Sequence, residues 1–400
     1  WVFGPSLDLY EPFADDESPI VAATALVGLV SFGGGDAAQR ARGTLQACAE
    51  SGSHEQRLAL ALAIRYSPGA SYIDLLVQLA NATEVDIRIA VAQAMREILS
   101  ARFVPALLPM LPIRALRSEA RTTLVDIGTE ALSNLDAVLG DPEADHDVRL
   151  HVPRTISFFP PGPAAAVLMR HLESTDSDTL RYRILRAIGR CHAADPALHL
   201  DRDVLGRHLE LAVTDAFCFL DRRLSLQRGA AQQAARATPI HDLLVDLLTQ
   251  RQELATERLF RLVGLLYPSE DARTLYRGIH DTNAKVRDSS RELLEHLLED
   301  PLQGAVLALV DDIADSARLT RAHPHYERQD LGYVDTLRDL LKRGDTGTVD
   351  LVAAHAVAIG AHALVPQLEQ LRTSPSTAIV TAVEHALAKF AMSEIASHGS

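Results

Sequence analysis

The residues best placed to do chemistry lie in one short polar stretch, "RAHPHYERQ", at 321–329. His323, His325 and Glu327 offer nitrogen and oxygen donors two residues apart, and an extended loop would place them on one side of the chain. A structural zinc site needs four ligands, and this stretch supplies three, so we predict no metal site. A loop that contacts a partner protein fits better. Its predicted partner-binding residues are Arg321, His323, His325, Tyr326 and Arg328.

No other stretch has the spacing of a catalytic or cofactor motif. The sequence lacks HExxH, GxSxG and the G-x-x-x-x-G-K-[ST] phosphate loop. A glycine-rich turn, "FGGGDAAQR" at 32–40, enters a predicted helix, but Asp36 at the helix start would repel a phosphate. Cys48, Cys191 and Cys218 share no CxxC spacing and fall in apolar contexts, which is typical of buried thiols in a reducing compartment. We therefore predict no catalytic residue, no cofactor and a protein that is not an enzyme.

Composition restricts the partners of the protein. The 400 residues carry 39 basic and 53 acidic side chains, and the net charge of −14 opposes non-specific binding to nucleic acid. Only Lys285, Lys342 and Lys389 are lysines. High genomic GC content explains this bias, although a subset of the arginines can serve paired contacts with anions. Aromatic residues make up 5% of the chain, which favours helices packed through small and aliphatic side chains over a β-sandwich.

The helices that position these residues repeat along the chain. An arginine is followed at offsets of 3, 7 and 10 by apolar or small residues, which lie on one side of a helix. Shorter apolar segments such as "YIDLLVQLA" (72–80) alternate with these helices, and short breakers separate the two. Successive arginines at 57, 88, 117, 149 and 181 are spaced by 31, 29, 32 and 32 residues. The arginines of this repeat slot are Arg57, Arg88, Arg117, Arg149, Arg181 and Arg287.

A helix pair that repeats in this way cannot bury its apolar side alone, so it stacks on its neighbours as a solenoid. We predict an all-α fold, an α-α superhelix with an irregular middle section and essentially no sheet. No apolar run reaches the roughly 18 residues of a transmembrane helix. The predicted segments are an N-terminal extension or linker at 1–17, regular repeats at 18–200, longer irregular helices at 201–269, a repeat at 270–314, a polar insertion loop at 315–334, C-terminal repeats at 335–392 and a tail at 393–400.

Three segments show the repeat most clearly: "RSEARTTLVDIG" (117–128), "RYRILRAIGRC" (181–191) and "VDLVAAHAVAIG" (349–360). They resemble the second helix of HEAT repeats. The resemblance implies a solenoid whose second helices line a concave surface for a partner protein. In HEAT repeats an aspartate before the slot arginine often forms a ladder between neighbours. The candidates for such a ladder are Asp86, Asp147 and Asp178.

Residues 255–312 carry a narrower resemblance. The segments "RLFRLVGLLYP" and "VRDSSRELLEHLL", with the acidic ending "LVDD", are similar to the HEAT-containing cytosolic region of bacterial ATP/ADP-translocase-like nucleotide carriers. This resemblance implies a cytoplasmic regulatory domain at the cytosolic face of the inner membrane, attached to a transporter domain outside this chain. The chain begins with Trp1 rather than Met, which fits a piece of a longer protein.

We therefore predict a non-catalytic scaffold that binds a protein partner through its concave face and loops. The alternative is a helical-repeat enzyme of the DNA glycosylase or bilin lyase type. A glycosylase needs a basic groove with aromatic residues, whereas this chain is acidic and Trp1 is its only tryptophan, so we predict no nucleic-acid partner. A local stripe of arginines within the acidic protein is the feature that would favour the alternative.

Overall fold

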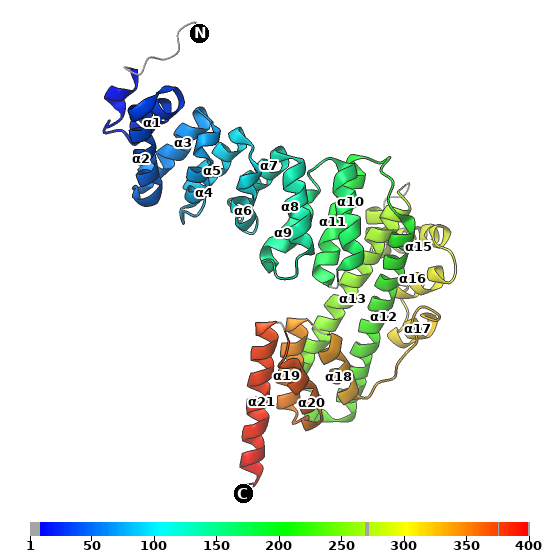
Figure 1. The fold of residues 1–400 in the computed structure, drawn as a ribbon. Helices are drawn as coiled ribbons and strands as arrows, with labels where there is room; N and C mark the ends of the chain where they lie inside the picture. Colours follow the sequence, from blue (N-terminus) through cyan, green and yellow to red (C-terminus); the bar gives the residue numbers. More distant parts are fainter. Residues whose placement is uncertain (1–8, 176, 269–271, 344, 375, 399–400) are drawn as a thin grey trace. The chain divides into compact units, whose positions relative to one another are not determined.

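The chain folds into an all-α solenoid (Figure 1). The structure is a computed structural model, and it describes residues 9–175, 177–268, 272–343, 345–374 and 376–398. Within these ranges there is no β-strand. The chain divides between Leu200 and Asp201 into two compact units. The predicted fold class is thus confirmed.

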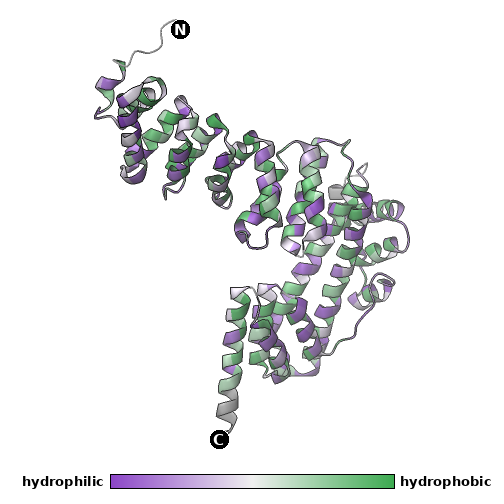
Figure 2. Ribbon diagram, viewed as in Figure 1, coloured by the Kyte–Doolittle hydropathy of each residue, from purple (hydrophilic) through white to green (hydrophobic). Residues whose placement is uncertain are grey.

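The first unit consists of helix pairs in two layers. The odd-numbered helices pack on one another in chain order, and the even-numbered helices form the second layer, with α2 against α4 and α8 against α10. In Figure 2 these helices alternate between hydrophobic and hydrophilic segments, as expected where one side of each helix is buried. The helices are α1 (Pro19–Phe32), α2 (Gly35–Ser51), α3 (His54–Tyr66), α4 (Ile73–Leu79), α5 (Val85–Ile98), α6 (Val104–Leu107), α7 (Arg117–Ile127), α8 (Thr129–Gly140), α9 (His146–Ile156), α10 (Pro161–Ser174) and α11 (Asp178–Ala194).

Local sequence signals set where these helices begin and end. Ser53 and Gln56 form a capping box at the start of α3, in which each side chain accepts a hydrogen bond from the other residue's backbone N–H. The side chain of Asp145 caps the start of α9, and that of Ser177 caps the start of α11. Each accepts one hydrogen bond from a backbone N–H of its helix. Gly128 separates α7 from α8 with a φ of 86°, a conformation that strains any residue with a side chain. The repeat boundaries therefore follow from single residues.

The described part of the predicted N-terminal extension is docked on the first repeat. The ring of Tyr10 stacks on that of Phe32, with 6.3 Å between ring centroids. Gly28 makes room for this ring, because a Cβ at that position would lie 2.5 Å from a carbon of Tyr10. Residues 9–17 thus cover the apolar helix α1.

The second unit is organised around two long antiparallel helices, α12 and α13. Arg202 at the start of α12 donates a hydrogen bond to the carbonyl of Leu266 at the end of α13 (2.7 Å). The prediction of a loop over 315–334 is wrong in its first part, because residues 315–321 form a helix. The helices are α12 (Arg202–Gln232), α13 (Pro239–Leu266), α14 (Ala272–Ile279), α15 (Ala284–Leu297), α16 (Leu302–Val310), α17 (Asp315–Arg321), α18 (Tyr333–Arg343), α19 (Thr346–Ala358), α20 (Val365–Leu371) and α21 (Thr377–His398).

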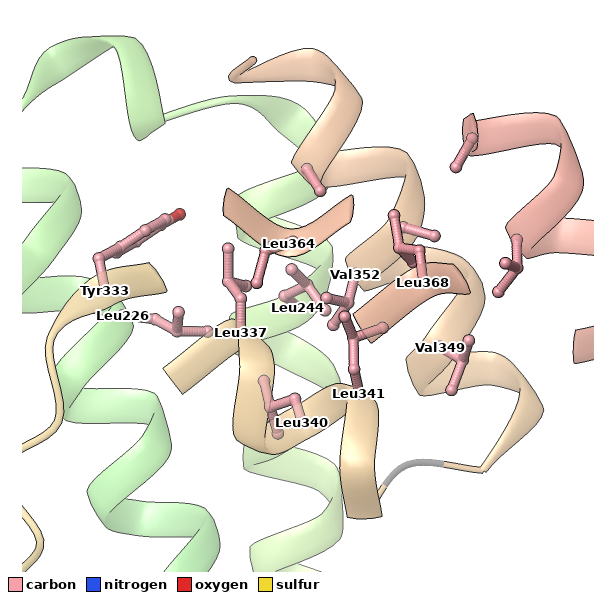
Figure 3. Packing of buried hydrophobic residues seen from close by; sticks show 14 of the residues in the cluster. Leu226, Leu244, Tyr333, Leu337, Leu340, Leu341, Val349, Val352, Leu364 and Leu368 are labelled. Carbon is pink, nitrogen blue, oxygen red and sulfur yellow. The ribbon is translucent and has the colours of Figure 1, made fainter. Parts of the chain in front are cut away.

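The C-terminal repeats of the second unit share a core with the long helices. Figure 3 shows Leu244 of α13 and Leu226 of α12 among side chains of α18, α19 and α20. Leu337, Val352 and Leu364 at the centre of this cluster are fully buried. The cluster joins α18–α21 to α12 and α13, so these helices form one body.

A chain of hydrogen bonds crosses this core. Thr238 Oγ1 contacts His355 Nδ1 (3.0 Å), His355 Nε2 contacts the hydroxyl of Tyr333 (2.7 Å), and that hydroxyl contacts His241 Nδ1 (3.0 Å). His355 is completely buried. Each group can donate one hydrogen bond to the next only while both imidazoles are neutral. Burial, together with the neighbouring His241, lowers the pKa of His355 from 6.5 to about 4.

Candidate functional site

The slot arginines hold each helix pair together. Four of the six donate a hydrogen bond to a backbone carbonyl at or just beyond the end of the preceding helix, where carbonyls lack helical partners and carry partial negative charge. These bonds run from Arg117 to Leu111 (2.6 Å), Arg149 to Leu139 (3.2 Å), Arg181 to Thr175 (2.9 Å) and Arg287 to Asp281 (2.9 Å). Arg57 instead pairs with Glu84 (2.7 Å), and burial lowers the pKa of Arg88. The slot is therefore a structural position, and the binding surface must be sought elsewhere.

The three ladder aspartates behave differently from one another. Asp86 pairs with His54 of the preceding repeat (2.8 Å), so it links two repeats. Asp178 pairs with Arg181 of its own helix (2.7 Å). Asp147 makes no ion pair within the described ranges. The repeats are thus linked by polar pairs, but a continuous aspartate–arginine ladder is not formed by these residues.

The segment predicted to bind a partner folds onto α12. Arg321, His323 and Arg328 are exposed, whereas His325 is partly buried and its carbonyl accepts a hydrogen bond from Thr214 of α12 (3.3 Å). No group of three or more potential metal-ligating side chains is found in the part of the chain that the structure describes. Arg321 pairs with Asp311 (3.3 Å) and Arg328 with Asp330 (2.9 Å), so of the five predicted residues His323 alone is both exposed and outside an ion pair among the described residues.

Tyr326 anchors this segment instead of facing a partner. It is 7% exposed, and its hydroxyl donates to Asp221 (2.8 Å) and accepts from Arg222 (2.9 Å). Arg222 is itself buried and also donates to Asp339 (2.8 Å) and Gln329 (2.9 Å). A buried guanidinium is stable only when its charge and N–H groups are satisfied in this way. The prediction that Tyr326 contacts a partner is wrong, because the residue completes a buried network.

Basic side chains gather on the odd-numbered layer of the first unit. Four arginines stand at offsets of 2, 5 or 9 from the slot arginines of α9 and α11, a histidine and a phenylalanine fill the two remaining positions, and these offsets lie on one side of a helix. The two helices pack against each other. We call this surface the arginine face. It consists of His151, Arg154 and Phe158, on α9 and just beyond its end, and Arg183, Arg186 and Arg190 on α11.

The side chains of the arginine face are held in different ways. Arg154 and Arg186 are exposed, and Arg186 lies over the ring of Tyr182 at 5.7 Å from its centroid. The side chain of Arg154 has no hydrogen-bond or ion-pair partner among the described residues. Arg183 donates to the carbonyl of Leu150 (2.9 Å), which ties α11 to α9. The exposed guanidinium of Arg154 is therefore available to a ligand.

Arg121 of α7 adds a positive charge beside the arginine face. Its guanidinium lies 5.1 Å from the ring centroid of Phe158, and its Nε donates to the hydroxyl of Thr155 (3.5 Å). Its Nη2 atom is buried and has no hydrogen-bond partner. Burial and the charges of neighbouring arginines, Arg154 first, lower the pKa of Arg121 to about 10. Arg121 and Arg154 are thus close enough for their charges to repel each other, an arrangement that an anion between them would relieve.

The two helices of the arginine face carry acids only in their first turns, Asp147 in α9 and Asp178 in α11. Residues 148–172 and 179–194 contain no aspartate or glutamate. Burial, together with the nearby Arg186, lowers the pKa of Arg183, and Asp147 at the start of α9 opposes this only in part. Burial also lowers the pKa of His151, although its Nδ1 donates a hydrogen bond to the carbonyl of Asp147, so this imidazole is neutral at pH 7. A net positive patch therefore exists on a unit that is acidic overall.

The sequence held a signal for this surface. Superposing the repeats on the slot arginine shows the repeated spacing of buried positions, whereas the residues of the arginine face stand two, five and nine residues after the slot. The signal was the absence of acids from 148–172 and 179–194 in a chain with 53 acidic residues. The proximity of Arg121 to Arg154 required the structure, because 33 residues separate them in the chain.

Comparisons with known proteins add little to this geometry. No protein-family model and no curated protein matches the chain. One solved structure, from work on a conserved phosphorylation switch in the interaction between cadherin and beta-catenin, aligns over 97% of this chain and 99% of its own with 13% identity and a TM-score of 0.26. A score this low supports no inference about this chain. In the described residues, no helix is both long and apolar enough to span a bilayer.

Proposed function

We propose that the protein is a non-catalytic scaffold that binds an acidic segment of a partner protein on the arginine face. The observation that carries the proposal is the pair Arg154 and Arg186, two exposed guanidiniums on adjacent helices with no acid beside them on those helices. Guanidinium groups form paired, charge-assisted hydrogen bonds with carboxylates. Rows of such groups also raise the association rate of an acidic partner.

The non-catalytic part of the proposal is supported by how the reactive side chains are used. Burial raises the pKa of all three thiols, that of Cys191 to about 11, which leaves them protonated and poorly nucleophilic at neutral pH. The buried Asp221 accepts a hydrogen bond from Tyr326, and the buried Arg222 donates one to Asp339. In the described residues these groups therefore hold the fold together.

We extend the proposal to a cytoplasmic domain of a nucleotide-carrier-like protein at the inner membrane of a bacterium. Its support is the sequence resemblance of residues 255–312, which span the end of α13 and the helices α14–α16 of the second unit. The test is the reading frame on either side of this chain. Hydrophobic spans in it would support the carrier context, and their absence would remove it.

A binding titration tests the scaffold proposal. A fluorescent peptide rich in glutamate and aspartate is titrated with the protein, and anisotropy is read at low and at physiological salt. We expect saturable binding that weakens with salt, and none with a lysine-rich peptide. The double variant Arg154→Glu/Arg186→Glu should weaken binding by about tenfold or more, since each reversal replaces an attraction with a repulsion.

A charge-matched control separates local from overall charge. Arg40 of α2 and Arg170 of α10 are exposed on the other layer, with side chains 69% and 61% accessible. Arg40→Glu/Arg170→Glu changes the net charge by the same amount as the test variant. Equal loss of affinity in both double variants would contradict the arginine face as the binding site.

A further inference from the structure

Arg154 and Arg186 occupy equivalent positions in neighbouring repeats. Each stands five residues after the slot arginine of its helix, on α9 and α11, which pack against each other. Packed helix axes lie about 8–10 Å apart, so the ends of two arginine side chains can meet over the groove between them. Arg186 is steadied by the ring of Tyr182 (5.7 Å). On two packed helices such a pair can contact one anion from two sides.

The positive charge around Arg154 and Arg186 is greater than one carboxylate can neutralise. Arg121 lies beside Phe158 and Thr155, and its buried Nη2 has no hydrogen-bond partner among the described residues. Coulomb attraction is stronger near a buried charge than near a solvated one. Together with Arg154 and Arg186 this makes three positive charges. A phosphomonoester carries nearly two negative charges and three acceptor oxygens, so it matches the group better than a carboxylate does.

The positive surface is short. The positions of α7 that correspond to the arginine face hold Glu119, Thr122 and Asp126. In α5 the corresponding positions are Ala90, Gln93 and Glu97. A nucleic acid that followed the layer would meet these acids within one or two helices and be repelled. The arrangement suits a single phosphate on a short chain segment.

We propose that Arg154 and Arg186 clamp the phosphate of a phosphoserine or phosphothreonine within the partner segment. This inference rests on the proposed function and specifies its ligand. Phosphorylation of the partner would then switch its binding to this protein, because the phosphate replaces a neutral hydroxyl with a group that accepts several charge-assisted hydrogen bonds. The half-exposed ring of Phe158 offers an apolar contact for the residue next to the phosphate.

Three labelled peptides of one acidic sequence test the inference. They differ at one central position, which is serine, glutamate or phosphoserine. We expect the phosphoserine peptide to bind about tenfold or more tightly than either of the others. Arg154→Gln should weaken the phosphoserine peptide more than the serine and glutamate peptides and so remove most of this preference. The side chain of Arg154 makes no hydrogen bond or ion pair among the described residues, so this variant should fold, and Arg42→Gln, at an exposed arginine of α2, is the matched control.

The outcomes separate the inference from the proposed function. Equal affinity for the three peptides overturns the phosphate clamp and leaves the acidic-segment scaffold in place. Binding of none of them overturns both. A single-stranded DNA oligonucleotide that binds as tightly as the phosphoserine peptide, through Arg154, also overturns the inference, because the site would then recognise a polyanion.

Discussion

Acidification should loosen the second unit through His355. The imidazole is fully buried between the hydroxyls of Thr238 and Tyr333, and its pKa is lowered from 6.5 to about 4. A base whose pKa is lowered in the folded state stabilises the fold at pH values above the pKa that the base has in the unfolded chain. That stability is lost as the pH falls from 6.5 towards 4, because the unfolded chain takes up a proton that the folded chain refuses.

The size of the effect follows from the two pKa values. Between pH 6.5 and pH 5 only the unfolded state is substantially protonated at this site, and each pH unit is worth about 1.4 kcal/mol. The second unit should therefore lose about 2 kcal/mol at pH 5 relative to pH 8 through this group. His241 adds to the loss, because burial lowers its pKa as well.

Hydrogen exchange detected by mass spectrometry reads the effect where it arises. After correction for intrinsic rates, protection of peptides from α19 should fall about 30-fold between pH 8 and pH 5, which corresponds to about 2 kcal/mol. In His355→Gln, whose amide can bond both neighbours without titrating, about half or more of this fall should disappear. The reasoning is refuted if the glutamine variant loses as much protection as the wild-type protein.

Three further predictions concern stability, measured as the free energy of unfolding in urea. Tyr326→Phe should cost about 1–2 kcal/mol, because a buried carboxylate loses a donor; no change would contradict the anchor. Gly229→Ala should cost about 2 kcal/mol or more, since its Cβ would overlap the ring of Tyr333, whereas Gly206→Ala on the same helix, with open space around it, should gain about 0.5–1 kcal/mol. Arg117→Ala should cost about 1–3 kcal/mol through two lost bonds to carbonyls, and a cost near zero would refute its structural role.

The helical fold could be predicted from sequence because its information is local. Offsets of 3, 7 and 10 after a slot arginine mark a buried side, and the buried Val91 and Met95 of α5 follow this pattern. Short elements in polar or proline-rich segments were harder. The segment 103–111, for example, is broken at Pro105 and Pro109 into the single turn α6 and a 3-10 turn.

Sites that depend on contacts between distant residues could not be predicted in the same way. Arg222 meets Tyr326 and Asp339 across more than 100 residues of chain, and nothing in the sequence pairs them. For this reason the sequence predicts an exposed Tyr326, whereas the structure shows that the residue is buried. The arginine face was within reach of sequence analysis, since it repeats at fixed offsets, but only once the slot arginines are recognised as structural.

Photo-crosslinking tests the central claim most directly. A phosphoserine peptide of acidic sequence carries a benzophenone beside the phosphate, and the crosslinked residues are mapped by mass spectrometry on the full chain. The account predicts adducts on α9 and α11, within residues 148–158 and 180–190, that Arg154→Glu/Arg186→Glu abolishes and Arg40→Glu/Arg170→Glu preserves. Adducts confined to the even-numbered layer or to the second unit, with affinity retained in the first double variant, would contradict it.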